Sequence, residues 1–133
     1  PLFPLVVRYY LASSGLERNL RNVVFDPSSI SDEMREGYLS PFLEKNIFTG
    51  LAKMIRDDEG DLPSEMLHQV KVPCLLIWGE QDKVVPLPIG RRLAKELPDA
   101  RLVILQETGH LVPEERPEEV FQQINHFLSG NHS

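Results

Sequence analysis

The segment VPCLLIWGEQDKVVP, residues 72–86, decides the fold class predicted for this chain of 133 residues. Its first seven residues form a continuous apolar run, which is typical of a strand buried on both faces of a parallel sheet. Gly79 ends the run, and the polar residues after it indicate a turn. The segment ARLVILQE, residues 100–107, predicts a second strand. Between the two strands, PIGRRLAKELP predicts a helix whose apolar stripe consists of Ile89, Leu93, Ala94 and Leu97.

A last helix is predicted to begin near Pro117, after a loop that holds His110. Proline suits the first position of a helix, and apolar residues then recur at the spacing of one helical face. These residues are Val120, Phe121, Ile124, Phe127 and Leu128. Residues 69–133 therefore predict the order strand, helix, strand, helix, which is an α/β arrangement with a βαβ unit and a packing helix.

Residues 1–68 show the periodicity of helices rather than strands. Ser31 is predicted to cap a helix that carries acidic residues in its first turn and ends at Pro41. A further helix is predicted from Phe42 to the charged loop RDDEGDLP, residues 56–63. The chain is thus expected to hold a helical region over residues 1–68 and an α/β segment over residues 69–133.

Charge and composition narrow the classes of partner. The chain has 14 basic and 20 acidic residues and a net charge of −6, which disfavours binding to nucleic acid. No apolar run approaches the roughly 18 residues of a membrane span, so we expect no membrane partner and a cytoplasmic protein. The single cysteine, Cys74, cannot form an internal disulfide. Neither a metal nor a cofactor is expected. Three histidines are spread along the chain without a second ligand at metal-binding spacing, namely His68, His126 and His132.

Asp82 and His110 follow the two predicted strands, one after each. A βαβ connection makes its strands parallel, so both loops leave the same carboxyl edge, where open α/β sheets bind ligands. Neighbouring strands lie about 4.8 Å apart, which allows the two side chains to meet. A carboxylate that orients an imidazole leaves the far nitrogen free to act as a base. Plain turn chemistry remains the alternative interpretation of both residues.

The motif WGEQD at residues 78–82, followed by GH at residues 109–110, resembles the carboxyl-terminal part of the α/β-hydrolase fold family. The resemblance covers about residues 70–128 and implies that Asp82 is the acid and His110 the base of a catalytic triad. Glu80 is a rival acid, but the family pattern places the carboxylate at the last position of WGEQD. The four glutamates near the last helix are interpreted as a solvated face; they are Glu114, Glu115, Glu118 and Glu119.

The segment SDEMREGYLSPF, residues 31–42, resembles, more loosely, the helical cap that many members of this family carry. Seven of the ten aromatic residues precede residue 49, and they fit either a helical core or the lining of a substrate pocket. Some capped members use a cap tyrosine to polarise a substrate oxygen. Tyr38 is therefore a candidate substrate-binding residue.

The family's nucleophile motif, commonly G-x-S-x-G, does not occur in these 133 residues. Ser13 and Ser14 fit a turn better than a nucleophile. We therefore expect the carboxyl-terminal part of a longer hydrolase, with an incomplete sheet and an inactive isolated chain that self-associates or requires its missing half. The expected substrate is a small organic molecule with an ester, amide, epoxide or carbon–halogen bond. The alternative function is a truncated, non-catalytic module that acts in binding or assembly.

Overall fold

The computed structural model describes residues 15–44, 47–57, 60 and 62–130. The packing of the Cα atoms divides the chain into two compact units. The first unit comprises Pro1–Asn22 and Pro27–Asp61, and the second comprises Val23–Asp26 and Leu62–Ser133. The short segment Val23–Asp26 thus packs with residues that lie more than 80 positions further along the chain. The assignment of residues 1–68 to a cap and 69–133 to a hydrolase core stays a prediction.

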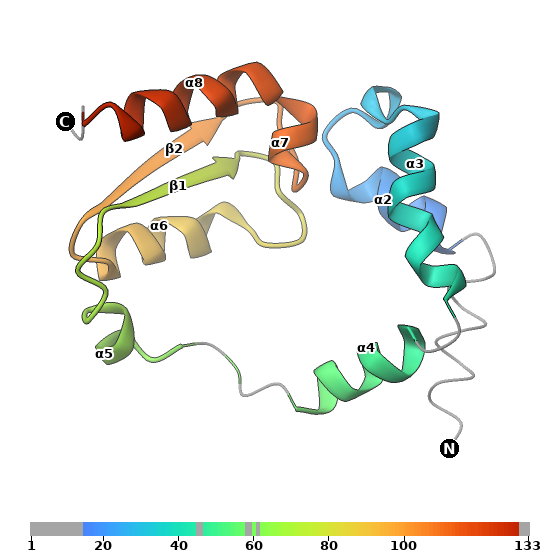
Figure 1. The fold of residues 1–133 in the computed structure, drawn as a ribbon, viewed down its shortest axis with the longest axis horizontal. Helices are drawn as coiled ribbons and strands as arrows, with labels where there is room; N and C mark the ends of the chain where they lie inside the picture. The colour runs from blue at the N-terminus through green and yellow to red at the C-terminus, as the bar shows by residue number, and fades with distance from the viewer. Residues whose placement is uncertain (1–14, 45–46, 58–59, 61, 131–133) are drawn as a thin grey trace. The chain divides into compact units, whose positions relative to one another are not determined.

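A two-stranded parallel sheet forms the centre of the second unit. Strand β1 (Cys74–Gly79) pairs with β2 (Ala100–Leu105) in a register that places Gly79 opposite Leu105. Helix α6 (Leu87–Glu96) connects the strands, and α7 (Val112–Glu115) and α8 (Pro117–Leu128) come after β2. Figure 1 shows α6 and α8 on opposite faces of the sheet. The predicted α/β order of strand, helix, strand, helix is confirmed, with α7 as an added turn of helix.

The contact between β1 and α6 depends on a large residue facing a small one. The indole ring of Trp78 lies against Gly90, where a Cβ atom would come within 2.7 Å of the ring. Because side chains alternate along a strand, Trp78 and Leu76 point to the α6 face, while Leu75 and Ile77 point to the α8 face. The predicted helical stripe is confirmed for Leu93, Ala94 and Leu97, which are partly buried. It is wrong for Ile89, which is 45% exposed, while its neighbour Gly90 is buried against Trp78.

Helix α8 leaves much of its predicted apolar face uncovered within the described residues. Phe121 and Leu128 are 63% and 74% exposed, whereas Val120 and Phe127 are partly buried. Few apolar side chains are buried in the described parts of the chain; these are Leu20, Val24, Leu67 and Val112. A sheet of two strands is too narrow to cover its packing helices.

The described part of the first unit is helical, as predicted, although one of the predicted helices is interrupted. It contains α2 (Leu16–Val23, whose last residue joins the second unit), η2 (Pro27–Ser29), α3 (Asp32–Leu39), η3 (Ser40–Leu43) and α4 (Ile47–Arg56). Ser31 is confirmed as the N-terminal capping residue of helix α3, since its hydroxyl accepts a hydrogen bond from the Met34 backbone amide at 3.1 Å.

The continuous helix predicted from Phe42 is wrong. Phe42 belongs to the short helix η3, which has Pro41 in its first turn, and Glu44 then adopts an extended conformation with ψ of 137°. An extended residue breaks the helical path, so α4 begins anew at Ile47. The second unit contains one more short helix before the sheet, α5 (Ser64–Leu67). Within the described ranges, no helix is both long enough and apolar enough to cross a membrane.

Candidate active site

Asp82 lies in a tight turn that starts where β1 ends. Its Oδ1 atom accepts hydrogen bonds from the backbone amides of Val84 and Val85, at 2.8 and 2.9 Å. The indole Nε1 of Trp78 donates to the Val85 carbonyl at 2.9 Å, which ties the far side of the turn to the strand. The turn chemistry expected for an aspartate is therefore present, and it occupies only one of the two carboxylate oxygens.

The other oxygen of Asp82 meets His110 across the carboxyl edge of the sheet. Oδ2 lies 2.9 Å from Nδ1 of His110, although 28 positions separate the residues in sequence. The Asp82 side chain is only 5% exposed and that of His110 is 37% exposed. A carboxylate accepts hydrogen bonds, so it favours the tautomer with the proton on Nδ1 and leaves Nε2 as the basic nitrogen. The predicted proximity is confirmed, while a catalytic role stays a prediction.

The environment keeps Asp82 ionised. Burial acts to raise the pKa of this carboxyl group, but the hydrogen bonds from His110 and from the two valine amides together outweigh it. The pKa of Asp82 therefore lies below its ordinary value. An ionised carboxylate can both orient the imidazole of His110 and stabilise it when it takes up a proton.

The loops that carry Asp82 and His110 are joined by two hydrogen bonds between Gln81 and Thr108. The Gln81 amide donates to the Thr108 carbonyl at 3.0 Å, and the Thr108 amide donates to Oε1 of Gln81 at 3.1 Å. Thr108 is fully buried. A Cβ atom on Gly79 would lie 2.5 Å from the Thr108 carbonyl oxygen and closer still to that of Gly109. Glycine at position 79 therefore permits the close approach that brings Asp82 to His110.

Glu115 is a residue of this site that the sequence interpretation missed. Instead of facing solvent, its carboxylate accepts hydrogen bonds from the backbone amides of Gly109 and Phe25. The interpretation of four glutamates as a solvated face is therefore wrong for Glu115. The one available signal was its place five residues after His110, in the turn of helix next to the histidine loop.

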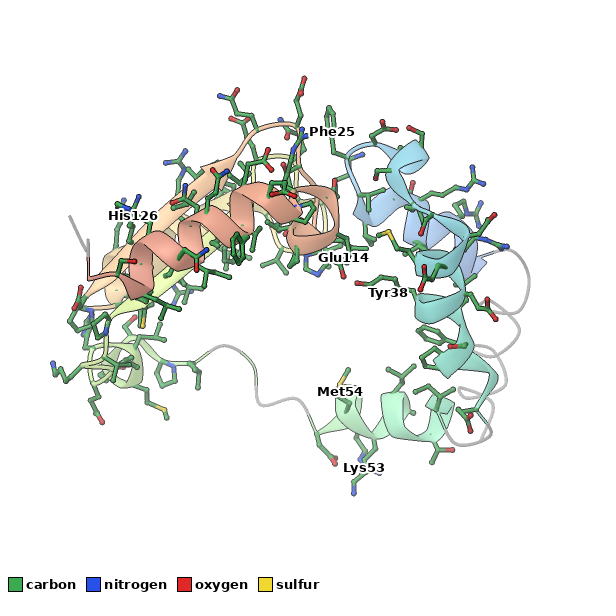
Figure 2. The ribbon with its side chains drawn as sticks, turned by 45° about the horizontal axis from the view of Figure 1, so that its top comes forward. Phe25, Tyr38, Lys53, Met54, Glu114 and His126 are labelled. Carbon is green, nitrogen blue, oxygen red and sulfur yellow. The ribbon has the colours of Figure 1, made fainter. Side chains whose placement is uncertain are left out.

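The rival acid Glu80 does not take the place of Asp82. Its side chain is exposed and accepts a hydrogen bond from Nε2 of Gln81 at 2.9 Å. Tyr38 projects from α3 in the first unit and is 36% exposed (Figure 2). A contact between Tyr38 and substrate stays a prediction.

Three further features bear on a functional site: the two serines considered as nucleophiles, clusters of metal-binding side chains, and pockets. Ser13 and Ser14 lie outside the described residues. In the part of the chain that the structure describes, no three His, Cys, Asp or Glu side chains gather as a metal site would require. An open pocket of about 310 Å³ lies in the helical region, and none of the predicted site residues lines it. The pocket is lined by Leu20, Arg21, Pro27, Ile30, Asp32 and Arg35.

Comparison with known proteins shows the family to which the fold belongs. The sequence profile of the α/β hydrolase fold matches residues 14–117, most of the chain. The chain belongs to the α/β-hydrolase fold family. It is 47% identical over 128 residues to the uncharacterised hydrolase YugF of Bacillus subtilis (strain 168), covering 96% of this chain and 47% of the relative.

More distant relatives carry names that specify a reaction. The chain is 29% identical over 117 residues to a 2-hydroxy-6-oxononadienedioate/2-hydroxy-6-oxononatrienedioate hydrolase of Paraburkholderia phymatum, covering 86% of this chain and 41% of that protein. A solved 2-hydroxy-6-oxo-6-phenylhexa-2,4-dienoate hydrolase of Rhodococcus sp. strain RHA1 has a similar fold, with a TM-score of 0.74 at 23% identity. That alignment covers 90% of this chain and 47% of the solved chain. The chain thus spans about half the length of the relatives that it matches.

Proposed function

We propose that this chain supplies the acid, Asp82, and the base, His110, of a hydrolase whose nucleophile lies in an upstream part of the same protein. The observation that carries the proposal is the 2.9 Å hydrogen bond between the two side chains at the carboxyl edge of parallel strands. Nucleophile, acid and base occur in that order along the chain of α/β-hydrolases. The relatives, about twice as long as this chain, have room for the nucleophile before the acid.

In this mechanism, Nε2 of His110 removes a proton from the nucleophile or from a water molecule. If the nucleophile is a serine, its oxygen attacks the substrate carbon while His110 takes the proton, and the imidazolium then donates it to the leaving group. If the nucleophile is an aspartate, His110 activates the water that releases the covalent intermediate. In both cases Asp82 holds the ring orientation and stabilises the charged imidazolium.

A substrate with a carbonyl group is favoured among the bond types considered. Relatives whose names specify a reaction include the 2-hydroxy-6-oxononadienedioate/2-hydroxy-6-oxononatrienedioate hydrolases. They also include a monoacylglycerol lipase of Mus musculus, which is 35% identical over 69 residues, covering 52% of this chain and 20% of the lipase. A ketone and an ester both present a carbonyl carbon to a nucleophile. We therefore expect hydrolysis of a small ester, amide or related carbonyl compound, with epoxides and carbon–halogen bonds as the less favoured classes.

The test compares variants of the full-length protein that carries this chain. Turnover of p-nitrophenyl acetate and of a 2-hydroxy-6-oxo dienoate is measured for the wild type, Asp82→Asn and His110→Ala. Loss of a general base, or of the carboxylate that orients it, lowers kcat by about 10²- to 10⁴-fold. Matched controls are Asp99→Asn and His126→Ala, which change exposed residues of the same types.

The proposal requires that the two site variants lose turnover while the two controls keep it. Unchanged turnover of either substrate in His110→Ala would remove the base from the mechanism. A full-length wild type that hydrolyses neither these substrates nor an epoxide or haloalkane would favour the binding or assembly function instead.

A further inference from the structure

We propose that Glu115 is a positioning residue, which fixes the backbone of the histidine loop and thereby the place of the His110 imidazole. The inference rests on the proposed function of His110. The Glu115 side chain does not touch the imidazole or Asp82 through any hydrogen bond of the described structure; it acts on the peptide unit that precedes His110.

The carboxylate of Glu115 accepts hydrogen bonds from two backbone amides that are distant from each other in sequence. Gly109 donates to both oxygens, at 3.0 Å each, and Phe25 donates to Oε2 at 2.7 Å. Hydrogen bonds to an ionised carboxylate are stronger than those between neutral groups. The segment Val23–Asp26 is thereby tied to the residue immediately before His110.

A direct backbone hydrogen bond also joins the same two segments. The His110 amide donates to the carbonyl of Val23. A Cβ atom on Gly109 would lie 2.6 Å from that carbonyl oxygen and 2.7 Å from the Phe25 nitrogen, so the segments lie too close together for a side chain at position 109. The amides of Gly109 and His110 are therefore both held, one by Glu115 and the other by Val23.

The neighbour of Glu115 holds the other end of the loop. The Arg116 guanidinium donates to the Glu107 carbonyl at 3.0 Å and to Oγ1 of Thr108 at 3.3 Å. Glu107 has a φ of 49°, a left-handed conformation that is uncommon for a residue with a side chain. Two successive side chains at the junction of α7 and α8, the acidic Glu115 and the basic Arg116, thus form hydrogen bonds to residues 107–109 of the loop.

Loss of the Glu115 carboxylate should loosen the histidine loop. In Glu115→Ala the amides of Gly109 and Phe25 lose their acceptor, and the loop is free to shift. A displacement of about 1 Å at a catalytic group can cost about 100-fold in rate. Glu115 lies beside Glu114 of α7, which Figure 2 labels.

The experiment uses the full-length protein with the variants Glu115→Ala and Glu115→Gln, and Glu118→Gln as matched control. Glu118 is exposed in the first turn of α8, so its variant removes a charge a few residues away without touching the loop. We expect Glu115→Ala to lower kcat by about 10- to 100-fold with KM unchanged. Glu115→Gln should recover part of this loss, because an amide oxygen still accepts the Gly109 and Phe25 bonds. The control should match the wild type.

A second measurement does not depend on turnover. The ring proton on Nδ1 of His110, observed by NMR, should exchange faster with solvent in Glu115→Ala than in the wild type and in Glu118→Gln. Glu115→Gln serves as the test variant for both readouts if Glu115→Ala fails to fold. Wild-type kcat and slow Nδ1 proton exchange in Glu115→Ala, or in a folded Glu115→Gln if Ala is unusable, would overturn the positioning role. An inactive wild type would contradict the proposed function, and the NMR comparison would still decide the role of Glu115.

Discussion

At the scale of single residues, each of the two carboxylate oxygens of Asp82 has a different set of hydrogen-bond partners. Oδ1 closes the turn after β1 through the amides of Val84 and Val85, and Oδ2 receives Nδ1 of His110. Because all three partners are donors, each of them favours the ionised form of the carboxyl group. The residue that shapes the turn is therefore the same one that holds the imidazole.

The lowered pKa of Asp82 predicts how stability depends on pH. The folded state binds the Asp82 proton less readily than the unfolded chain does, so ionised Asp82 stabilises the fold at neutral pH. This contribution is present above the pKa of an unfolded aspartate and is lost as the pH falls through the lower, folded value. The free energy of unfolding of the full-length protein, measured by urea titration, should exceed that of Asp82→Asn at neutral pH. The difference should shrink as the solution is made acidic, and a difference that stays constant or grows would contradict this account.

The close packing around Gly79 leads to a second prediction for a single residue, the stability of Gly79→Ala. In Gly79→Ala the new methyl group collides with the carbonyl oxygens of Thr108 and Gly109, so the histidine loop must move. We expect a loss of about 1 to 3 kcal/mol in the free energy of unfolding, as for other overpacked sites. Gly37→Ala is the control, because a Cβ atom there meets nothing within 4 Å inside helix α3, and alanine should stabilise it by about 0.5 to 1 kcal/mol. Equal effects of the two substitutions in a thermal melt would show that the contact at Gly79 does not matter.

At the scale of elements, the strand, helix, strand order brings Asp82 and His110 together. Loops that leave the carboxyl ends of neighbouring parallel strands emerge at one edge, and the register places Gly79 beside Leu105. Trp78 then fixes the first loop from the α6 side through its bond to the Val85 carbonyl.

The role of Trp78 can be tested by removing its hydrogen-bond donor. Trp78→Phe loses the Nε1 donor, which leaves the Val85 carbonyl without this partner, together with part of the indole ring that lies against Gly90. We expect a loss of about 1 to 2 kcal/mol in stability and a lower kcat in the full-length protein, because the Asp82 turn is less firmly held. Unchanged unfolding and turnover would contradict the role given to the bond between Trp78 and Val85.

The parts of this site that could be predicted are those set by local pattern. The apolar run before Gly79 and the turn after it place Asp82 at a strand end, and the same holds for His110. Glu115 could not be recognised, since its partner Phe25 lies 90 positions away and nothing in a row of glutamates distinguishes the one that turns inward. The break after Phe42 was missed for a related reason, because apolar spacing continues across Glu44 although its backbone is extended.

At the scale of the whole molecule, the described residues bury little apolar surface for a chain of this length. The sheet has two strands, and one face of α8 exposes Phe121 and Leu128. β1 pairs with β2 on one side, and within the described residues its other edge has no partner strand. An unpaired strand edge and exposed apolar side chains both favour association.

We therefore expect the isolated 133-residue chain to be marginally stable and to self-associate, whereas the full-length protein should not share this behaviour. Sedimentation velocity of the isolated chain should show species heavier than a monomer, and thermal unfolding should be broad. A single monomeric species with a sharp cooperative transition would mean that these residues close their own core.

The central claim is that Asp82 holds His110 with Nε2 free to act as a base. The most direct measurement is ¹⁵N NMR of histidine-labelled full-length protein, at a pH where the ring of His110 is neutral, with the signals assigned by their loss in His110→Ala. The account predicts the tautomer protonated on Nδ1 in the wild type and, because an asparagine amide can donate to Nδ1, a shift toward the Nε2-protonated form in Asp82→Asn. A wild-type ring protonated on Nε2, or a tautomer that does not respond to Asp82→Asn, would contradict it.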